Sequence, residues 1–129
     1  MTTESFYRQV FVEMGKPDLS GAERVTEAVF HALRDRLTPA EADQAAAQLP
    51  RPLKLVWWRG DVMGRRPLKL HRKSFYARVR RDAELASERE ARQATRAVFG
   101  ALKQQISPGE CDDILAQLPK DLKDVWENA

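Results

Sequence analysis

The chain has 129 residues, of which 43% are hydrophobic and 32% charged, and its formal net charge is +3. This length allows one compact domain or two small packed halves, whereas either half alone is marginal. The chain has no apolar run long enough to span a membrane and no secretory signal pattern, so we expect a cytoplasmic protein that is not exported. The single cysteine, Cys111, excludes an internal disulfide, which suits a reducing compartment.

The first two helices are predicted over residues 4–14 and 22–37. In both segments the apolar residues recur at spacings of three and four, as on one face of an α-helix. Ser20 and Glu23 match the Ser-x-x-Glu pattern of a capping box, so we expect Ser20 to be the N-cap of the second helix.

The third helix is predicted to begin at Thr38 and to run to about Gln48. Thr38 supplies a hydroxyl for the N-cap, Pro39 fits N1, and Glu41 stands at N3, so hydroxyl and carboxylate together can satisfy free backbone N–H groups. Pro50 then begins a fourth, short helix, since proline fits the first turn of a helix but breaks its interior. Its core-facing residues are expected to be Leu53, Val56 and Trp57.

Residues 70–129 repeat residues 1–60 without a gap. By direct count, 22 of the 60 aligned pairs, each separated by 69 positions, are identical. Most of the identical residues are apolar, proline or capping residues, so the duplicated unit is a fold and not a visible active site. We divide the chain into helical repeat 1 over 1–60, a basic linker over 61–69 and helical repeat 2 over 70–129.

The second repeat gives the same prediction of four helices. The first two are expected over 74–85 and 91–106, with Ser87 as a capping residue before the second. The third begins at Ser107 and the fourth follows Pro119. The predicted fold class is therefore all-α, with two tandem homologous helical units of about four helices each packed as a helical bundle.

The duplicated motifs resemble a known family. Both repeats contain Phe-Tyr-x-x-Val, Ala-Val-Phe-x-Ala-Leu, Ser/Thr-Pro-x-Glu-x-Asp and Gln-Leu-Pro-x-x-Leu-Lys-x-Val-Trp. This doubled pattern is similar to a prokaryotic family catalogued as domain of unknown function number 2267, and the likeness covers nearly the whole chain. The resemblance implies a small helical protein of two tandem copies and carries over no enzymatic activity and no cofactor. The chain departs from the family in the arginines and lysines around the junction.

Those basic residues are concentrated between residues 59 and 81, where nine lysines and arginines stand against one acidic residue. Such a segment attracts polyanions and releases their counterions. The candidate polyanion-binding residues are Arg59, Arg65, Arg66, Lys69, Arg72, Lys73, Arg78, Arg80 and Arg81.

The segment has more than one interpretation. It can be a solvated linker whose charge complements the acidic second repeat, within the chain or across a dimer. It can also bind the phosphates of DNA or RNA, or anionic lipid heads. The chain has no helix-turn-helix or zinc-finger pattern, so nucleic-acid binding would act through the backbone and without sequence specificity.

The sequence predicts no catalytic residue, no metal site and no cofactor. His31 and His71 lie outside the duplicated pattern and are interpreted as isolated surface histidines. Cys111 has no identifiable base, and its role stays open. Glu41 and Glu110 occupy aligned positions of the two repeats, and helix capping and the helix dipole explain why both are glutamates.

The sequence thus predicts a non-enzymatic interaction or scaffold protein with a protein partner or with self-association. The alternative is a nonspecific nucleic-acid-binding protein that acts through residues 59–81.

Overall fold

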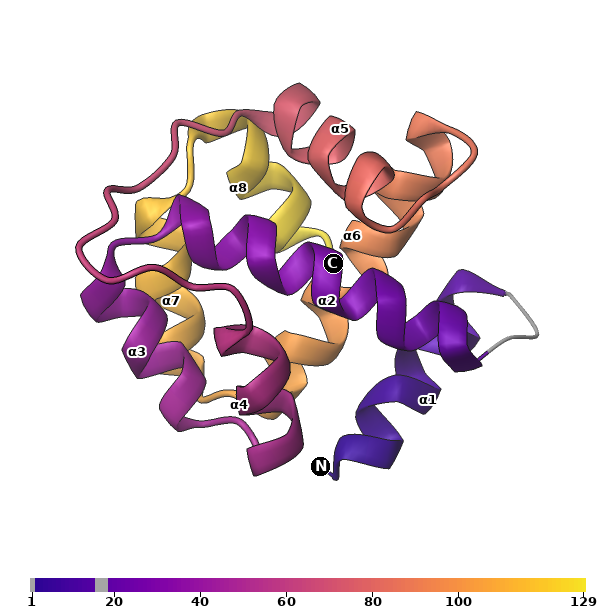
Figure 1. The fold of residues 1–129 in the computed structure, drawn as a ribbon, viewed down its shortest axis with the longest axis horizontal. Helices are drawn as coiled ribbons and strands as arrows, with labels where there is room; N and C mark the ends of the chain where they lie inside the picture. Colours follow the sequence, from indigo (N-terminus) through magenta and orange to yellow (C-terminus); the bar gives the residue numbers. More distant parts are fainter. Residues whose placement is uncertain (1, 16–18) are drawn as a thin grey trace.

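The computed structural model describes residues 2–15 and 19–129, and all regular elements in that part of the chain are α-helices (Figure 1). The helices of the first half are α1 (Thr3–Met14), α2 (Leu19–Arg36), α3 (Pro39–Ala47) and α4 (Arg51–Trp58). Those of the second half are α5 (Arg72–Asp82), α6 (Glu88–Gln105), α7 (Pro108–Gln117) and α8 (Lys120–Glu127). The predicted all-α bundle is confirmed.

Each half contains the same stack of three aromatic rings. The centroids of Phe6 and Phe30 lie 5.6 Å apart and those of Phe30 and Trp57 lie 5.3 Å apart, with the rings edge to face. Such pairs add about 0.5–1.5 kcal/mol beyond the area that they bury. The second half repeats the stack with Phe75, Phe99 and Trp126. Both tryptophans are buried, as their helical spacing predicts.

The two halves share one core. Helix α1 lies against α6 as well as α2, and α5 lies against α2 as well as α6. The buried apolar side chains of both halves form a single cluster. Figure 1 shows α3 and α7 side by side at the left, where they are also in contact. Each half therefore covers apolar surface of the other.

The N-caps of α3 and α7 are formed by the predicted hydroxyls. The backbone N–H of Glu41 donates to Thr38 Oγ1 at 3.3 Å, and that of Glu110 donates to Ser107 Oγ at 3.2 Å. The glutamates do not complete capping boxes, which corrects the second part of the prediction.

A glutamine from the other half takes the place of each carboxylate. The backbone N–H of Thr38 donates to Gln117 Oε1 at 2.9 Å, and that of Ser107 donates to Gln48 Oε1 at 2.6 Å. Because the N-cap N–H groups are bonded across the α3–α7 contact, the carboxylates of Glu41 and Glu110 are not needed for capping.

The start of α2 differs from the prediction. This helix begins at Leu19, so Ser20 is a residue of the helix and the predicted N-cap at Ser20 is wrong. At the corresponding place in the second half, Ser87 is the N-cap of α6 and accepts a hydrogen bond from the N–H of Glu90 at 3.1 Å. The Glu90 carboxylate accepts from the N–H of Ala86 at 2.8 Å.

Helix α5 ends at Asp82, before the predicted end at residue 85. Glu84 has a left-handed backbone with φ 55°, which stops the helix. The aligned residue in the first half is Gly15, the C-cap of α1, with φ 66°. The turn is the same in both halves, but only Gly15 adopts it without steric cost.

Candidate functional site

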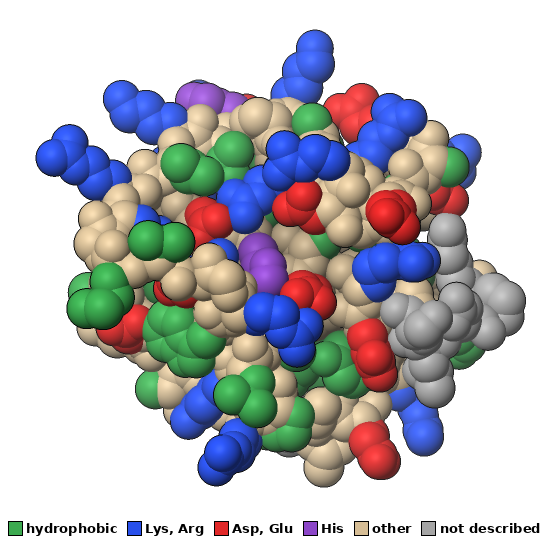
Figure 2. Space-filling view, viewed as in Figure 1, with side chains coloured by type: hydrophobic (Ala, Val, Ile, Leu, Met, Phe, Trp, Pro, Cys, Tyr) green, Lys and Arg blue, Asp and Glu red, His purple; other side chains and the backbone are tan. Residues whose placement is uncertain are grey.

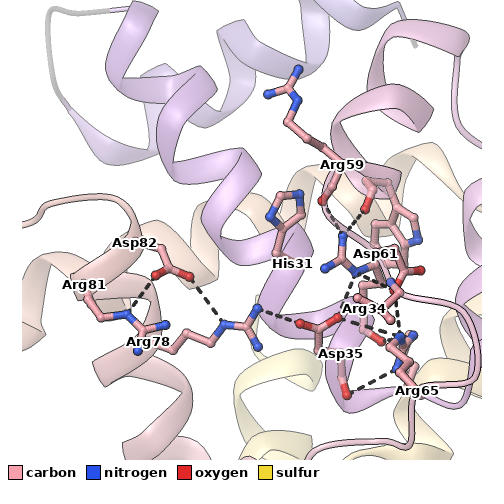
Figure 3. Close-up of polar contacts among 12 residues, drawn as sticks. His31, Arg34, Asp35, Arg59, Asp61, Arg65, Arg78, Arg81 and Asp82 are labelled. Carbon is pink, nitrogen blue, oxygen red and sulfur yellow. Dashed lines mark hydrogen bonds and ion pairs between the residues drawn. The ribbon is translucent and has the colours of Figure 1, made fainter.

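The loop between α4 and α5 is held against the fold by Arg65. Its guanidinium donates to the carbonyls of Arg34 at 2.7 Å and Leu37 at 2.9 Å, at the carboxyl end of α2, and pairs with Asp61 at 2.9 Å (Figure 3). The Leu68 N–H donates to the Asp35 carbonyl at 2.8 Å. The Arg65 side chain is only 12% exposed. Arg65 therefore caps the end of α2 and docks the linker.

Asp35 is the acidic centre of this network. It pairs with Arg34 at 2.9 Å and with Arg78 of α5 at 2.6 Å, and its side chain is 16% exposed. Burial by itself raises the pKa of this carboxyl, but the hydrogen bonds and charges of Arg34 and Arg78 outweigh it and hold the pKa below its usual value. The network links α2, the linker and α5.

Arg34 caps a second helix from a buried position. Its Nη1 donates to the carbonyls of Trp57 at 2.7 Å and Arg59 at 2.9 Å, at the end of α4. The aligned residue of the second half is Lys103, which donates to the Trp126 carbonyl at 2.7 Å at the end of α8. A basic residue thus holds the same helix end in both halves.

The structure separates the nine basic candidates into an inner and an outer group. Arg65 and Arg78 belong to the network above. Arg59 pairs with Glu27 at 2.9 Å, but its side chain is 61% exposed. The other six are also exposed: Arg66, Lys69, Arg72, Lys73, Arg80 and Arg81. Figure 2 shows basic side chains along the upper edge of the molecule, where Figure 1 places α5.

An open groove of about 790 Å³ lies between α5, α6 and α8. Glu88 and Asp124 are the acidic residues that line it, and five basic residues outnumber them. A neighbouring hollow of about 470 Å³ shares Lys73 with the groove and extends the basic surface to Arg80 and Arg81. The five basic residues of the groove itself are Arg72, Lys73, Arg89, Arg92 and Arg96.

Tyr76 also lines this groove, and neighbouring charges affect the pKa of its hydroxyl. Burial raises the pKa of the Tyr76 hydroxyl, while the positive charges of Arg72, Arg92 and Arg96 act in the opposite direction. A tyrosine beside several arginines offers a hydrogen-bonding hydroxyl among donors suited to phosphate oxygens. The groove thus brings five basic side chains and one tyrosine hydroxyl together on one surface.

The first half has the opposite charge around the aligned tyrosine. At Tyr7, burial and then the negative charges of Glu23 and Glu27 raise the hydroxyl pKa. Three positions change from glutamate to a basic residue between the halves, namely Glu4 to Lys73, Glu23 to Arg92 and Glu27 to Arg96.

The sequence prediction missed Arg89, Arg92 and Arg96. The prediction rested on the density of basic residues between residues 59 and 81. These three arginines follow that segment, on a helix that also carries acidic residues. Their spacing of three and four places them on one face of α6. The signal that would have found them is the charge reversal between aligned positions.

A pair of buried carboxyl groups forms the second unusual feature. Glu41 is 7% exposed and Glu110 is 5% exposed, and they meet where α3 and α7 pack. Burial, followed by the hydrogen bond and the negative charge of Glu41 and the charge of Asp113, raises the pKa of Glu110 from 4.5 to about 8. The pair therefore holds a proton near neutral pH.

His31 and Cys111 have structural surroundings. His31 is half-buried, with Nε2 2.7 Å from the Val56 carbonyl oxygen, and burial lowers its pKa; the predicted surface position is wrong. His71 is exposed, as predicted. The Cys111 thiol donates to the Lys103 carbonyl at 3.7 Å, and burial raises its pKa, which disfavours the thiolate that a nucleophile requires.

Exposed apolar side chains gather at the end of α4 and along the linker. Among the described residues, five of the six large hydrophobic side chains that are exposed fall between residues 55 and 68. Figure 2 shows hydrophobic side chains at the left of this face, over the loop that follows α4. We call these residues the apolar strip: Leu55, Trp58, Val62, Met63 and Leu68.

Fold and surface together define a small all-helical protein with a basic groove and without a membrane-crossing helix in the described ranges. The chain belongs to the family described as "Uncharacterized conserved protein (DUF2267)", whose model matches residues 3–125. No curated protein matches the chain.

Proposed function

We propose that the protein is a non-enzymatic binding protein of the cytoplasm whose α5–α6 groove binds the phosphate backbone of nucleic acid. The observation that carries this proposal is the set of five basic side chains around one groove, against two acidic ones. Arg and Lys contacts to phosphates release counterions, which supplies most of the affinity of nonspecific binding.

The proposal assigns this activity to a different set of residues from the basic segment 59–81. Arg65 and Arg78 are engaged with the fold, whereas Arg72 and Lys73 join three arginines of α6 across the groove. The groove is open and bears no strand platform or recognition helix, so its contacts are with phosphates and carry no sequence preference. The single free cysteine is in keeping with a reducing compartment.

The test is a titration of the purified protein against labelled duplex DNA and single-stranded RNA at several salt concentrations. Five neutralised phosphates predict that the logarithm of the association constant falls with the logarithm of salt concentration at a slope of about −4. The double variant R92E/R96E introduces the residues that the first half has at these positions. It should weaken binding at least about tenfold and reduce the slope by about 2.

The matched control is R24E/R51E, which changes the net charge equally at exposed residues outside the groove. It should change affinity by less than about threefold at moderate salt. Absence of saturable binding at low salt contradicts the proposal. Equal weakening by both double variants also contradicts it, because the attraction would then come from overall charge.

A second candidate function is self-association, which the apolar strip favours. Clustered apolar side chains at a surface mark sites of protein association, and Met63 is 98% exposed. The basic residues beside the strip complement the acidic surface that surrounds Tyr7 in a second copy. Sedimentation velocity over a wide concentration range tests this: we expect a dimer that W58R/M63R converts to a monomer, whereas a wild-type monomer at all concentrations excludes it.

A further inference from the structure

Glu41 and Glu110 place two carboxyl groups in the interior without enough partners. Each is more than nine-tenths buried, and when both carboxyls are ionised the Oε1 atom of each has no hydrogen-bond partner among the residues that the structure describes. Buried polar atoms are nearly always bonded, and a buried carboxylate is costly unless a donor or a cation faces it. A bound cation or donor beside these two oxygens would remove this cost.

Asp113 completes a set of three acidic ligands. It follows Glu110 by three residues in α7, and its carboxylate lies at the solvent side of the pair. One oxygen each of Glu41, Glu110 and Asp113 can be chosen so that all three lie within 4.8 Å of one another. Asp113 is exposed, so this set of three carboxyl groups extends from the interior to the surface.

The spacing fits a single metal ion. Ligand oxygens on opposite sides of an ion are about 4 Å apart for Mg²⁺ or Mn²⁺ and about 5 Å apart for Ca²⁺, twice the metal–oxygen distance. All-oxygen ligand sets select these hard cations over the softer zinc and copper. A proton shared between Glu41 and Glu110 is the alternative occupant of the pair, and it competes with the ion because ligating carboxylates must be deprotonated.

We propose that Glu41, Glu110 and Asp113 bind one hard divalent cation of the Mg²⁺, Ca²⁺ or Mn²⁺ class. The ion bridges α3 to α7 and so joins the two halves of the chain beside the reciprocal glutamine caps. Water molecules complete the coordination at the open side. This site is independent of the basic groove.

The test is a titration of chelator-treated protein with Mn²⁺, followed by electron paramagnetic resonance, in which bound Mn²⁺ loses the sharp signal of the free ion. Wild type should bind one Mn²⁺ per chain, Mg²⁺ or Ca²⁺ should displace it, and the melting temperature should rise with bound metal. E110Q and E41Q should each weaken binding at least about tenfold, since losing even an outer-shell partner costs about 10–100-fold.

The matched control is D112N, which removes one negative charge from the exposed surface of α7 but leaves the cluster intact. Its affinity for Mn²⁺ should remain within about twofold of wild type. Circular dichroism confirms that each variant is folded. Failure of wild type to bind Mn²⁺ at millimolar metal overturns the proposal. Equal weakening by D112N and E110Q overturns it too, because binding would then follow the overall charge of the helix.

Discussion

Two aligned residues, one in each half, can adopt the same backbone conformation at a different cost in free energy. Gly15 and Glu84 end α1 and α5 with left-handed φ angles of 66° and 55°. For a residue with a Cβ atom this conformation costs roughly 1–2 kcal/mol, whereas glycine adopts it freely. The two halves thus share this left-handed turn, although only the first half has the residue best suited to it.

Glu84→Gly should therefore stabilise the protein by about 0.5–1 kcal/mol, because relief of the strain exceeds the added flexibility of the unfolded chain. Urea denaturation at neutral pH measures this. Gly15→Ala is the converse variant and should destabilise by about 1 kcal/mol. The explanation fails if both variants leave the free energy of unfolding unchanged.

At the scale of elements, helix ends in this protein are held by side chains from other helices and from the linker. Arg65 caps α2, Arg34 caps α4, and Lys103 caps α8. Asp35 pairs with Arg34 at 2.9 Å and with Arg78 at 2.6 Å, and so connects α2 to α5. Removing this carboxylate leaves Arg34 with Asp61 at 3.7 Å and Arg78 with Asp82 at 3.4 Å, which are longer pairings.

Asp35→Asn should destabilise the protein by about 2–4 kcal/mol at neutral pH. The folded pKa of Asp35 lies below the unfolded value of 3.8, so its charge contributes stability above that value. This contribution is lost as the pH falls through the folded pKa.

The difference in the free energy of unfolding between wild type and Asp35→Asn should therefore narrow as the pH falls below 3.8. Urea denaturation at neutral and acid pH measures this difference. The control is Asp43→Asn at an exposed position, which should leave the free energy of unfolding unchanged at both pH values. If Asp35→Asn lowers the free energy of unfolding equally at both pH values, the destabilisation comes from packing and not from the charge of Asp35.

The helices themselves could largely be predicted from local chemistry. Thr38-Pro39 and Ser107-Pro108 start α3 and α7 as expected, because an N-cap hydroxyl and an N1 proline act within one turn. The glutamine caps and the meeting of Glu41 with Glu110 could not be predicted, since they depend on how α3 packs on α7. The contacts of Arg65 with the end of α2 could not be predicted for the same reason, since they depend on which carbonyl groups the folded chain places beside the linker.

At the scale of the whole molecule, part of the core of each half is covered by helices of the other half. Helix α6 packs against α1 and helix α5 packs against α2, and the buried apolar side chains of both halves form one cluster. A chain of sixty residues buries too small a fraction of its surface to offset the loss of such contacts.

The fragment 70–129, produced alone, should consequently show little helix and no cooperative melting. Mixing it with the fragment 1–69 should restore helicity, because the contacts between α1 and α6 and between α2 and α5 form again. Circular dichroism of each fragment and of the mixture measures both effects. A cooperative transition in fragment 70–129 alone would contradict the shared core.

The aligned tyrosines Tyr7 and Tyr76 have surroundings of different charge. Glu23 and Glu27, together with Arg59, act on Tyr7, whereas Arg72, Arg92 and Arg96, together with Glu88, act on Tyr76. Uneven charge orients a protein in the field of a charged polymer before the two touch, and so raises the rate of association. If the groove binds nucleic acid as proposed, the exchange of three glutamates for basic residues therefore affects the rate of association as well as the affinity.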